Sequence, residues 1–166
     1  MGMFDSLKVE LPLPLNKKEQ AKFSNINWND VVFQTKDLEC TLSTYTITKN
    51  GNLSSVIANG DWVRTMTKEE EKKAGKGGKF VFPHKFVEKS RKTIKVNHTG
   101  NIFFYDSILD KDGNEYWIEF SANFIKGKLQ DNIKKVEVRL SETAKQIKKR
   151  EREWQDRIEA DKKKIA

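Results

Sequence analysis

The stretch TLSTYTITKNGNLSSVI, residues 41–57, decides the fold class of this chain. Its first half carries the β-branched and aromatic residues that are typical of a strand. Asn50-Gly51 then supplies the pair of positive φ angles that a type I′ turn requires, and residues 53–57 return as a second strand. The stretch therefore predicts a β-hairpin. A second turn at 59–61 leads into 62–66 and predicts that the meander continues.

Four runs further along have the same strand character: FVFPHKFV at 80–87, TIKVNH at 93–98, NIFFYDSIL at 101–109 and EYWIEFSANF at 115–124. Pro83 cannot donate a ladder hydrogen bond, which places its run at a sheet edge or a bend. Asp112-Gly113 separates the last two runs and has hairpin chemistry. These runs predict that strands make up most of the chain.

The C-terminal part predicts one more strand and then a long helix. After a turn at 126–128, apolar residues at 136, 138 and 140 alternate with charged ones. Ser141 is expected to cap a helix over 141–166, which contains no Gly or Pro. Its apolar stripe is too thin for a fully buried helix, so we expect its first half to dock on the sheet. Pairing of the helix with a copy of itself, in a homodimer or higher oligomer, is the alternative, through Ile147, Trp154, Ile158 and Ile165.

These patterns predict a mainly β (α+β) protein. Residues 1–140 are expected to form an antiparallel β-meander or sandwich-like sheet domain, and 141–166 a long charged C-terminal α-helix. Residues 68–79 contain three glycines and no apolar residue except Ala74. They predict a flexible basic connection with a short helix at Lys68–Ala74. At 166 residues, the chain is long enough for one core with an appendage.

Several functional classes lack their signatures in this sequence. There is neither a run of 18 apolar residues nor a signal-peptide pattern, so we expect a cytoplasmic protein without a membrane contact. Cys40, His84 and His98 lack the spacing of a metal site, and neither a metal nor a cofactor is expected. No nucleophile elbow, Walker loop or dinucleotide-binding motif occurs. We therefore expect that the protein is not an enzyme.

The net charge of +8 is concentrated in two regions. Residues 1–67 are neutral overall and 99–133 carry −3, whereas 68–98 carry +6 and 134–166 carry +5. This distribution is expected when an anionic partner meets particular surfaces, although a lysine-rich composition also keeps a protein in solution.

The central basic segment, from Lys72 to Lys95, is the candidate binding site for an anionic ligand, either a nucleotide or nucleic acid. Glycines near its lysines could form an anion-binding nest of backbone N–H groups, and Phe80, Phe82, His84 and Phe86 alternate just beyond as a possible stacking platform. The alternative is an edge strand whose phenylalanines lie in the core, and residue type favours it because Phe is so often buried. The candidate ligand-binding residues are Lys72, Lys73, Lys76, Lys79, His84, Lys85, Arg91 and Lys92.

A resemblance to other proteins rests on MGMFD at 1–5, the proline pair at 12–14, FQTKDLECTLSTYTITKNG at 33–51, HTGNIFFYDS at 98–107 and EYWIEFSANFIKGKL at 115–129. Together these segments resemble a family of small uncharacterised proteins of tailed bacteriophages and prophages. Their most specific part is FQTKDL followed by the TYTIT strand and an Asn-Gly or Asp-Gly turn. The lysine-rich middle and the charged tail depart from the family pattern, and no functional residue carries over.

The resemblance implies a phage accessory protein that acts in the host cytoplasm. Such proteins often counter host defence or redirect host machinery, by sequestering nucleotide signals or nucleic acid or by blocking a host protein. The leading expectation is a non-enzymatic protein that binds its anionic ligand through the basic segment. The alternatives are an inhibitor or adaptor that contacts a host protein through the C-terminal helix, and a structural component of the virion.

Overall fold

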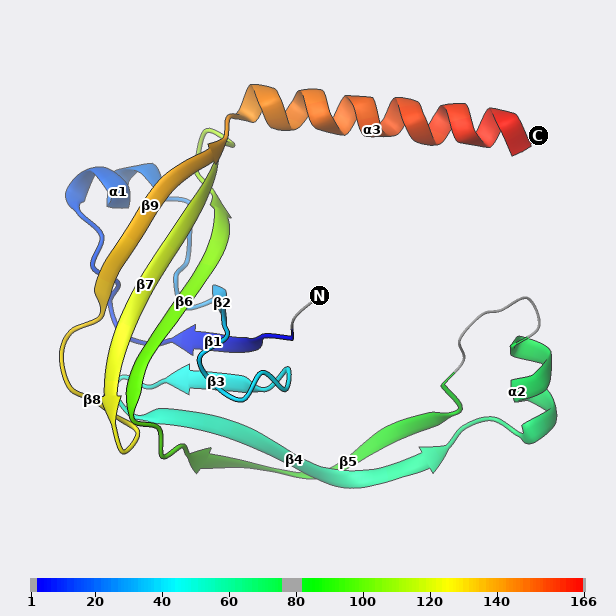
Figure 1. Ribbon diagram of the computed structural model, residues 1–166, viewed down its shortest axis with the longest axis horizontal. Helices are drawn as coiled ribbons and strands as arrows, with labels where there is room; N and C mark the ends of the chain where they lie inside the picture. The colour runs from blue at the N-terminus through cyan, green and yellow to red at the C-terminus, as the bar shows by residue number, and fades with distance from the viewer. Residues whose placement is uncertain (1–2, 76–81, 166) are drawn as a thin grey trace. The chain divides into compact units, whose positions relative to one another are not determined.

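The computed structural model describes residues 3–75 and 82–165, with side chains described as far as Asp161 (Figure 1). The chain divides into two compact units. The larger unit comprises Met1–Ser54 and Lys95–Ala166, and the hairpin unit comprises Ser55–Ile94. The larger unit is thus built from two separate parts of the chain, and the hairpin unit from the segment between them.

Nine strands of the described chain form one mixed sheet, in the order β5-β4-β3-β1-β2-β6-β7-β8, with β9 also paired to β7. Most pairs are antiparallel, and a C-terminal helix follows, so the predicted fold class is confirmed. One pair, β1 with β3, is parallel. The strands are β1 (Asp5–Val9), β2 (Val32–Thr35), β3 (Thr44–Ile47), β4 (Leu53–Arg64), β5 (His84–Lys95), β6 (Gly100–Leu109), β7 (Glu115–Ile125), β8 (Lys128–Leu129) and β9 (Lys134–Glu142).

The predicted hairpin between β3 and β4 is confirmed, but its turn is of another type. The Gly51 N–H donates to the Thr48 carbonyl at 2.8 Å, and the Thr48 N–H donates to the Asn52 carbonyl at 2.9 Å. Gly51 has φ +70, whereas Asn50 keeps a negative φ. This is a type I turn with a glycine bulge, rather than the predicted type I′ turn.

The predicted turn at 59–61 is wrong, because β4 runs through these residues without a break. Gly60 lies where the backbones of β4 and β5 approach each other closely. A Cβ at this position would overlap the carbonyl oxygen of Val87 and lie 2.8 Å from the ring of Phe86. Glycine inside a strand often marks such an approach, and its sequence signal is the same as that of a turn.

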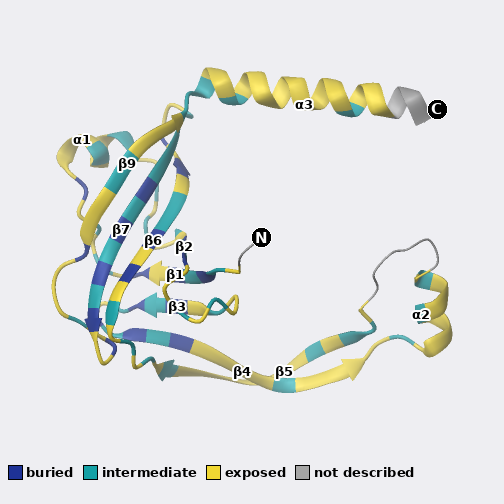
Figure 2. Ribbon diagram, in the orientation of Figure 1, coloured by how far each residue is buried: buried dark blue, intermediate teal, exposed yellow. Residues whose placement is uncertain are grey.

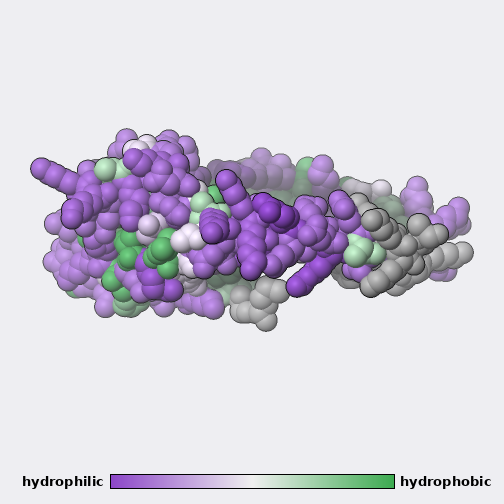
Figure 3. All heavy atoms as spheres, turned by 90° about the horizontal axis from the view of Figure 1, so that it is seen from above, coloured by the Kyte–Doolittle hydropathy of each residue, from purple (hydrophilic) through white to green (hydrophobic). Residues whose placement is uncertain are grey.

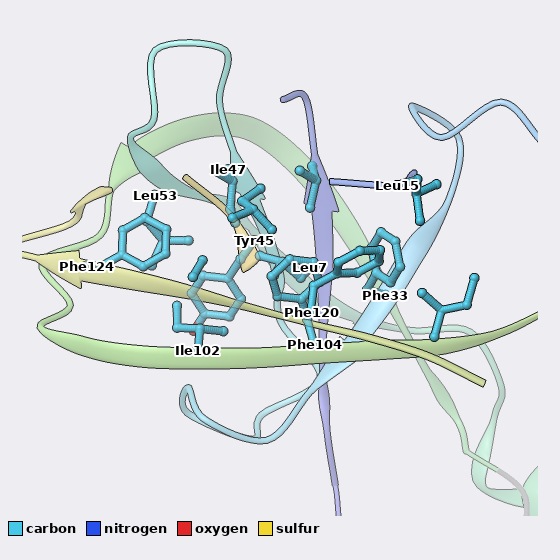
Figure 4. Close-up of a cluster of buried hydrophobic side chains, with 14 of the residues drawn as sticks. Leu7, Leu15, Phe33, Tyr45, Ile47, Leu53, Ile102, Phe104, Phe120 and Phe124 are labelled. Atoms are coloured by element: carbon cyan, nitrogen blue, oxygen red, sulfur yellow. The ribbon is translucent and has the colours of Figure 1, made fainter. Parts of the chain in front are cut away.

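The core of the larger unit lies on one face of its curved sheet (Figure 4). Phe33, Phe104 and Phe120 come from β2, β6 and β7 and are fully buried. Their ring centroids lie 5.3 to 5.8 Å apart. Buried residues recur at every second position of β7 from Ile118 to Phe124, and at 102, 104 and 108 of β6; Figure 2 shows them in dark blue. Burial of each ring contributes roughly 1.5–3 kcal/mol of folding free energy, and aromatic pairing adds to it.

A buried carboxylate holds the loop that carries the chain from β2 to β3. Asp5 is fully buried in β1. Its oxygens accept hydrogen bonds from the backbone N–H groups of Cys40 (2.7 Å), Thr41 (2.9 Å) and Ser43 (2.9 Å). Cys40 and Leu42 adopt positive φ angles of 53° and 61°. Such angles cost conformational energy in residues other than glycine, and the hydrogen bonds to Asp5 offset this cost. The loop thereby delivers β3 parallel to β1.

Three helices occur in the described chain: α1 (Lys17–Lys22), α2 (Lys68–Ala74) and α3 (Ala144–Ile165). The short helix predicted at Lys68–Ala74 is therefore confirmed, and Thr67 caps it together with Glu70. The predicted cap of the C-terminal helix at Ser141 is wrong. Ser141 belongs to β9, and Thr143 caps α3 by accepting from the Gln146 N–H at 3.3 Å while the Gln146 side chain accepts from the Thr143 N–H at 2.8 Å.

The expectation that the first half of α3 docks on the sheet is wrong. The junction with the sheet is short: the Ala144 N–H donates to the Asn114 side chain at 3.0 Å, and Ile147 is half-buried. Every residue from Lys148 to Arg157 is exposed. Seen from above, the side chains along α3 are mostly hydrophilic (Figure 3). No helix in the described residues is long and apolar enough to cross a membrane.

The chain leaves and re-enters the larger unit at neighbouring points. The Val96 N–H, just after β5, donates to the carbonyl of Leu53, the first residue of β4, at 2.9 Å. The Leu53 N–H in turn donates to the Gly127 carbonyl at 2.9 Å. Hydrogen bonds within the larger unit therefore fix both ends of the inserted segment.

Candidate functional site

The hairpin unit carries an exposed cluster of aromatic side chains, here called the aromatic cluster: Trp62 on β4, with Phe82, His84 and Phe86 in and just before β5. The ring of Trp62 lies 5.6 Å from that of Phe82 and 5.3 Å from that of Phe86, measured between centroids. Phe82 also contacts His84 at 6.0 Å. Trp62 is 63% exposed and Phe82 57% exposed.

Phe82 corrects the interpretation that its run belongs to the core. A phenylalanine in a sheet is ordinarily buried against a second layer. In the two-stranded ribbon of β4 and β5, consecutive residues point to opposite faces, and most of those described from Val56 on are exposed (Figure 2). Phe86 is half-buried against Trp62 and above Gly60. Phe80, the first residue of the alternating set, lies outside the described residues.

Exposed apolar residues also occupy the second face of the ribbon. Strand alternation places Ile57, Val63 and Val87 opposite the aromatic cluster, and they are 45%, 47% and 44% exposed. A two-stranded ribbon without a packed layer is at best marginally stable in water. The hairpin unit therefore exposes apolar side chains, whereas the larger unit buries those of its core.

Ion pairs connect elements of the hairpin unit and neutralise some of its charged side chains. The Arg64 guanidinium bonds to Glu71 of α2 and, through Nε, to the Met66 carbonyl at 2.8 Å. Arg91 holds Glu88 through two hydrogen bonds of 3.0 and 2.9 Å. This contact lowers the pKa of Glu88 and raises that of Arg91. Since these groups are exposed and water screens their charges, each pair contributes little to folding.

The remaining cations give the hairpin unit a positive field. Residues 55–94 contain ten lysines and arginines and five acidic residues, a net charge of +5. Lys89 pairs with Asp61. Lys72, Lys73, Lys85 and Lys92 have no ion-pair partner among the described residues. These cations stay available to an anion that approaches the ribbon.

The predicted ligand-binding residues are distributed over two elements. Lys72 and Lys73 lie exposed in the last turn of α2. On β5, strand alternation puts His84 and Lys92 on the face of the aromatic cluster, and Lys85 and Arg91 on the other face. His84 contacts Phe82, and Arg91 is engaged by Glu88. Lys76 and Lys79 lie outside the described residues.

The residues predicted for a helix contact lie on α3. Trp154 is 61% exposed, and Ile147 and Ile158 are half-buried. Ile165 is the last residue of α3, and its side chain lies outside the described set. Trp62 was not among the predicted site residues, because the turn expected at 59–61 separated residues 62–66 from the strand at 53–57, whereas β4 is continuous.

The described side chains form no group of three or more His, Cys, Asp and Glu that could hold a metal ion. Cys40 is half-buried, and its thiol donates to the Lys36 carbonyl at 3.3 Å. Comparison of the chain with protein-family models, with curated proteins and with solved structures finds no match.

Proposed function

We propose that the protein binds nucleic acid through its hairpin unit, with unpaired bases stacked on Trp62 and Phe82 and phosphates met by the surrounding lysines. The observation that carries this proposal is the 63% exposure of Trp62, which lies between the rings of Phe82 and Phe86. Every base has an aromatic face, and stacking on a protein ring contributes about 1–3 kcal/mol per base. The net charge of +5 favours a polyanion over a neutral ligand.

The same features favour a binding role over catalysis. The described residues of the hairpin unit offer rings and cations and, among themselves, no nucleophile held by a base, so the chemistry that they favour is recognition. The setting that fits best is a phage accessory protein in the host cytoplasm, where capture of nucleic acid or of a nucleotide signal would counter host defence. In this setting the protein acts by sequestering its ligand.

Fluorescence anisotropy with labelled single-stranded oligonucleotides tests the proposal. We expect Trp62→Ala to weaken binding by about 5- to 150-fold, which corresponds to the stacking energy of about 1–3 kcal/mol. Phe103→Ala is the matched control, because this phenylalanine is 41% exposed on β6, in the larger unit. Material that absorbs at 260 nm should also co-purify with the wild-type protein and be released by high salt.

Two results would refute this function. A Trp62→Ala affinity equal to that of the wild type would show that the aromatic cluster does not stack bases. The protein could also purify free of nucleic acid and bind neither oligonucleotides nor nucleotides in anisotropy and thermal-shift titrations. This result would contradict binding of any nucleic acid or nucleotide.

A second candidate function is favoured by the exposed Trp154. It lies on the same side of α3 as Ile147 and Ile158, which together form a short apolar stripe. Such a stripe fits a helix or groove of a protein partner, either a host protein or a second copy of this chain. Sedimentation of wild type and Trp154→Ala distinguishes self-association. A pull-down that loses a host protein after truncation at Leu140 identifies an adaptor or inhibitor.

A further inference from the structure

The side of α3 opposite its apolar stripe carries a row of cations. Lys145, Lys148, Lys149 and Arg152 follow one another at helical spacing, are all exposed, and line an open hollow of about 400 Å³ together with Ala144. Positions three, four and seven residues apart share one face of a helix. This cationic row lies in the larger unit and is independent of the hairpin unit.

The charge of the cationic row is largely uncompensated. Lys145, Lys148 and Arg152 have no ion-pair partner among the described residues. Lys149 reaches Glu153 only at 3.9 Å, with both side chains more than half exposed. Glu142, the acidic residue at the end of β9, is engaged by Arg150 at 2.7 Å. These two acidic residues therefore leave the row positive, and the next ones on this face, Asp156 and Glu159, lie one and two turns beyond Arg152.

The row is long enough to meet several phosphates. Seven residues of helix separate Lys145 from Arg152, a rise of about 10 Å along the axis. A nucleic acid duplex carries one negative charge per about 1.7 Å of its axis, both strands counted, so a segment of that length presents several phosphates. Among the described residues that line the hollow, only Ala144 is apolar, so the lining favours an anion.

We propose that the cationic row of α3 binds the sugar-phosphate backbone of nucleic acid, as a second contact that does not read bases. It adds affinity that depends on salt but not on sequence. It does not depend on base stacking by the hairpin unit, and either contact can exist without the other.

A labelled oligomer of abasic deoxyribose phosphates tests the row, because this probe has phosphates and no bases. Its affinity is measured by anisotropy over a series of KCl concentrations. Each lost phosphate contact reduces the slope of log K against log salt by about 0.7–0.9. We expect the triple variant Lys145→Glu, Lys148→Glu, Arg152→Glu to reduce this slope by about 2. The Gln triple variant at the same positions should do the same with less charge repulsion.

The matched control makes the same change of charge elsewhere in the larger unit, at the exposed residues Lys17, Lys18 and Lys111. It should change the slope by less than about 1 unit, the equivalent of one phosphate contact. Circular dichroism at 222 nm checks that α3 persists in each variant. An unchanged slope in both triple variants of the row, or an equal change in the control, would overturn the proposal.

Two further measurements separate this proposal from neighbouring ones. Trp62→Ala should leave binding of the abasic oligomer unchanged, whereas it weakens binding of an oligomer with bases. If only the oligomer with bases binds, and binding depends on Trp62, the row proposal fails and the hairpin unit keeps its function. Equal binding of poly-glutamate of matched charge, with the same loss in the variants, would identify an acidic protein as the partner and also overturn the proposal.

Discussion

Replacement of Gly60 by alanine tests whether the ribbon of the hairpin unit presents the aromatic cluster. Gly60 faces the backbone of β5 at the level of Phe86 and Val87. The added Cβ would overlap the Val87 carbonyl oxygen and would lie 2.8 Å from the Phe86 ring, well inside ordinary contact. The strands can accommodate it only by moving apart, at the position next to Trp62.

The size of the effect follows from this overlap. Introducing a methyl group into a packed position costs about 1–3 kcal/mol. Separating the strands also removes one or two ladder hydrogen bonds, each with a net value of about 1 kcal/mol. A total of about 2–5 kcal/mol exceeds what a marginal two-stranded ribbon can lose. We therefore expect the hairpin to open beyond residue 60, and Gly60→Ala to bind oligonucleotides as weakly as Trp62→Ala.

Hydrogen exchange read by mass spectrometry, together with anisotropy, measures both effects. Peptides covering 55–64 and 84–94 should lose protection, whereas peptides of β6 and β7 should keep it, because their core lies in the larger unit. Gly75→Ala is the control, since Gly75 has φ −77 and accepts any residue. Unchanged protection of 84–94 together with wild-type affinity would refute the reasoning about the close approach.

Three further predictions concern the larger unit. Asp5→Ala removes the acceptor of three backbone N–H groups and should cost about 4 kcal/mol in urea unfolding; a loss under about 1 kcal/mol would contradict its role. Gly127→Ala should lower the free energy of unfolding by more than about 2 kcal/mol in thermal melts, because φ is +73 and a Cβ would overlap the Val96 carbonyl. Burial raises the pKa of Asp106 despite the Ser107 N–H bond, so its ionised form costs stability once the pH rises through that raised pKa. Asp106→Asn should therefore unfold at higher urea than wild type at pH 7, and this advantage should vanish near pH 4, around the ordinary Asp pKa of about 3.9.

The hairpins of this fold could be predicted from the sequence because their turn chemistry is local. Asn50-Gly51 and Asp112-Gly113 both connect paired strands, as expected. The turn type at Gly51 could not be predicted, since a type I′ turn and a type I turn with a bulge both require glycine at this position. Thr143, by contrast, has Gln146 three residues later, a capping-box signal that Ser141 lacks.

The candidate site was harder to predict because it depends on which strands meet. Gly60 carries the same local signal in a turn as in a close backbone approach. Phe82 has the residue type of a core position, yet it is 57% exposed, because the described residues of the hairpin unit form no second layer over it. The parallel pairing of β1 with β3 joins segments far apart in sequence, and it depends on the buried Asp5, which a pattern of apolar residues does not reveal.

The hydrogen bond between Leu53 and Val96 has a consequence for how this protein can change. Because the inserted segment begins and ends at adjacent backbone positions, its length and content can vary without moving any strand of the core. Deletion of residues 56–93 with a two-residue turn in their place should leave an autonomous scaffold. Another recognition hairpin could be grafted at the same junction. The binding specificity of such a chain can thus evolve, or be engineered, separately from its folding.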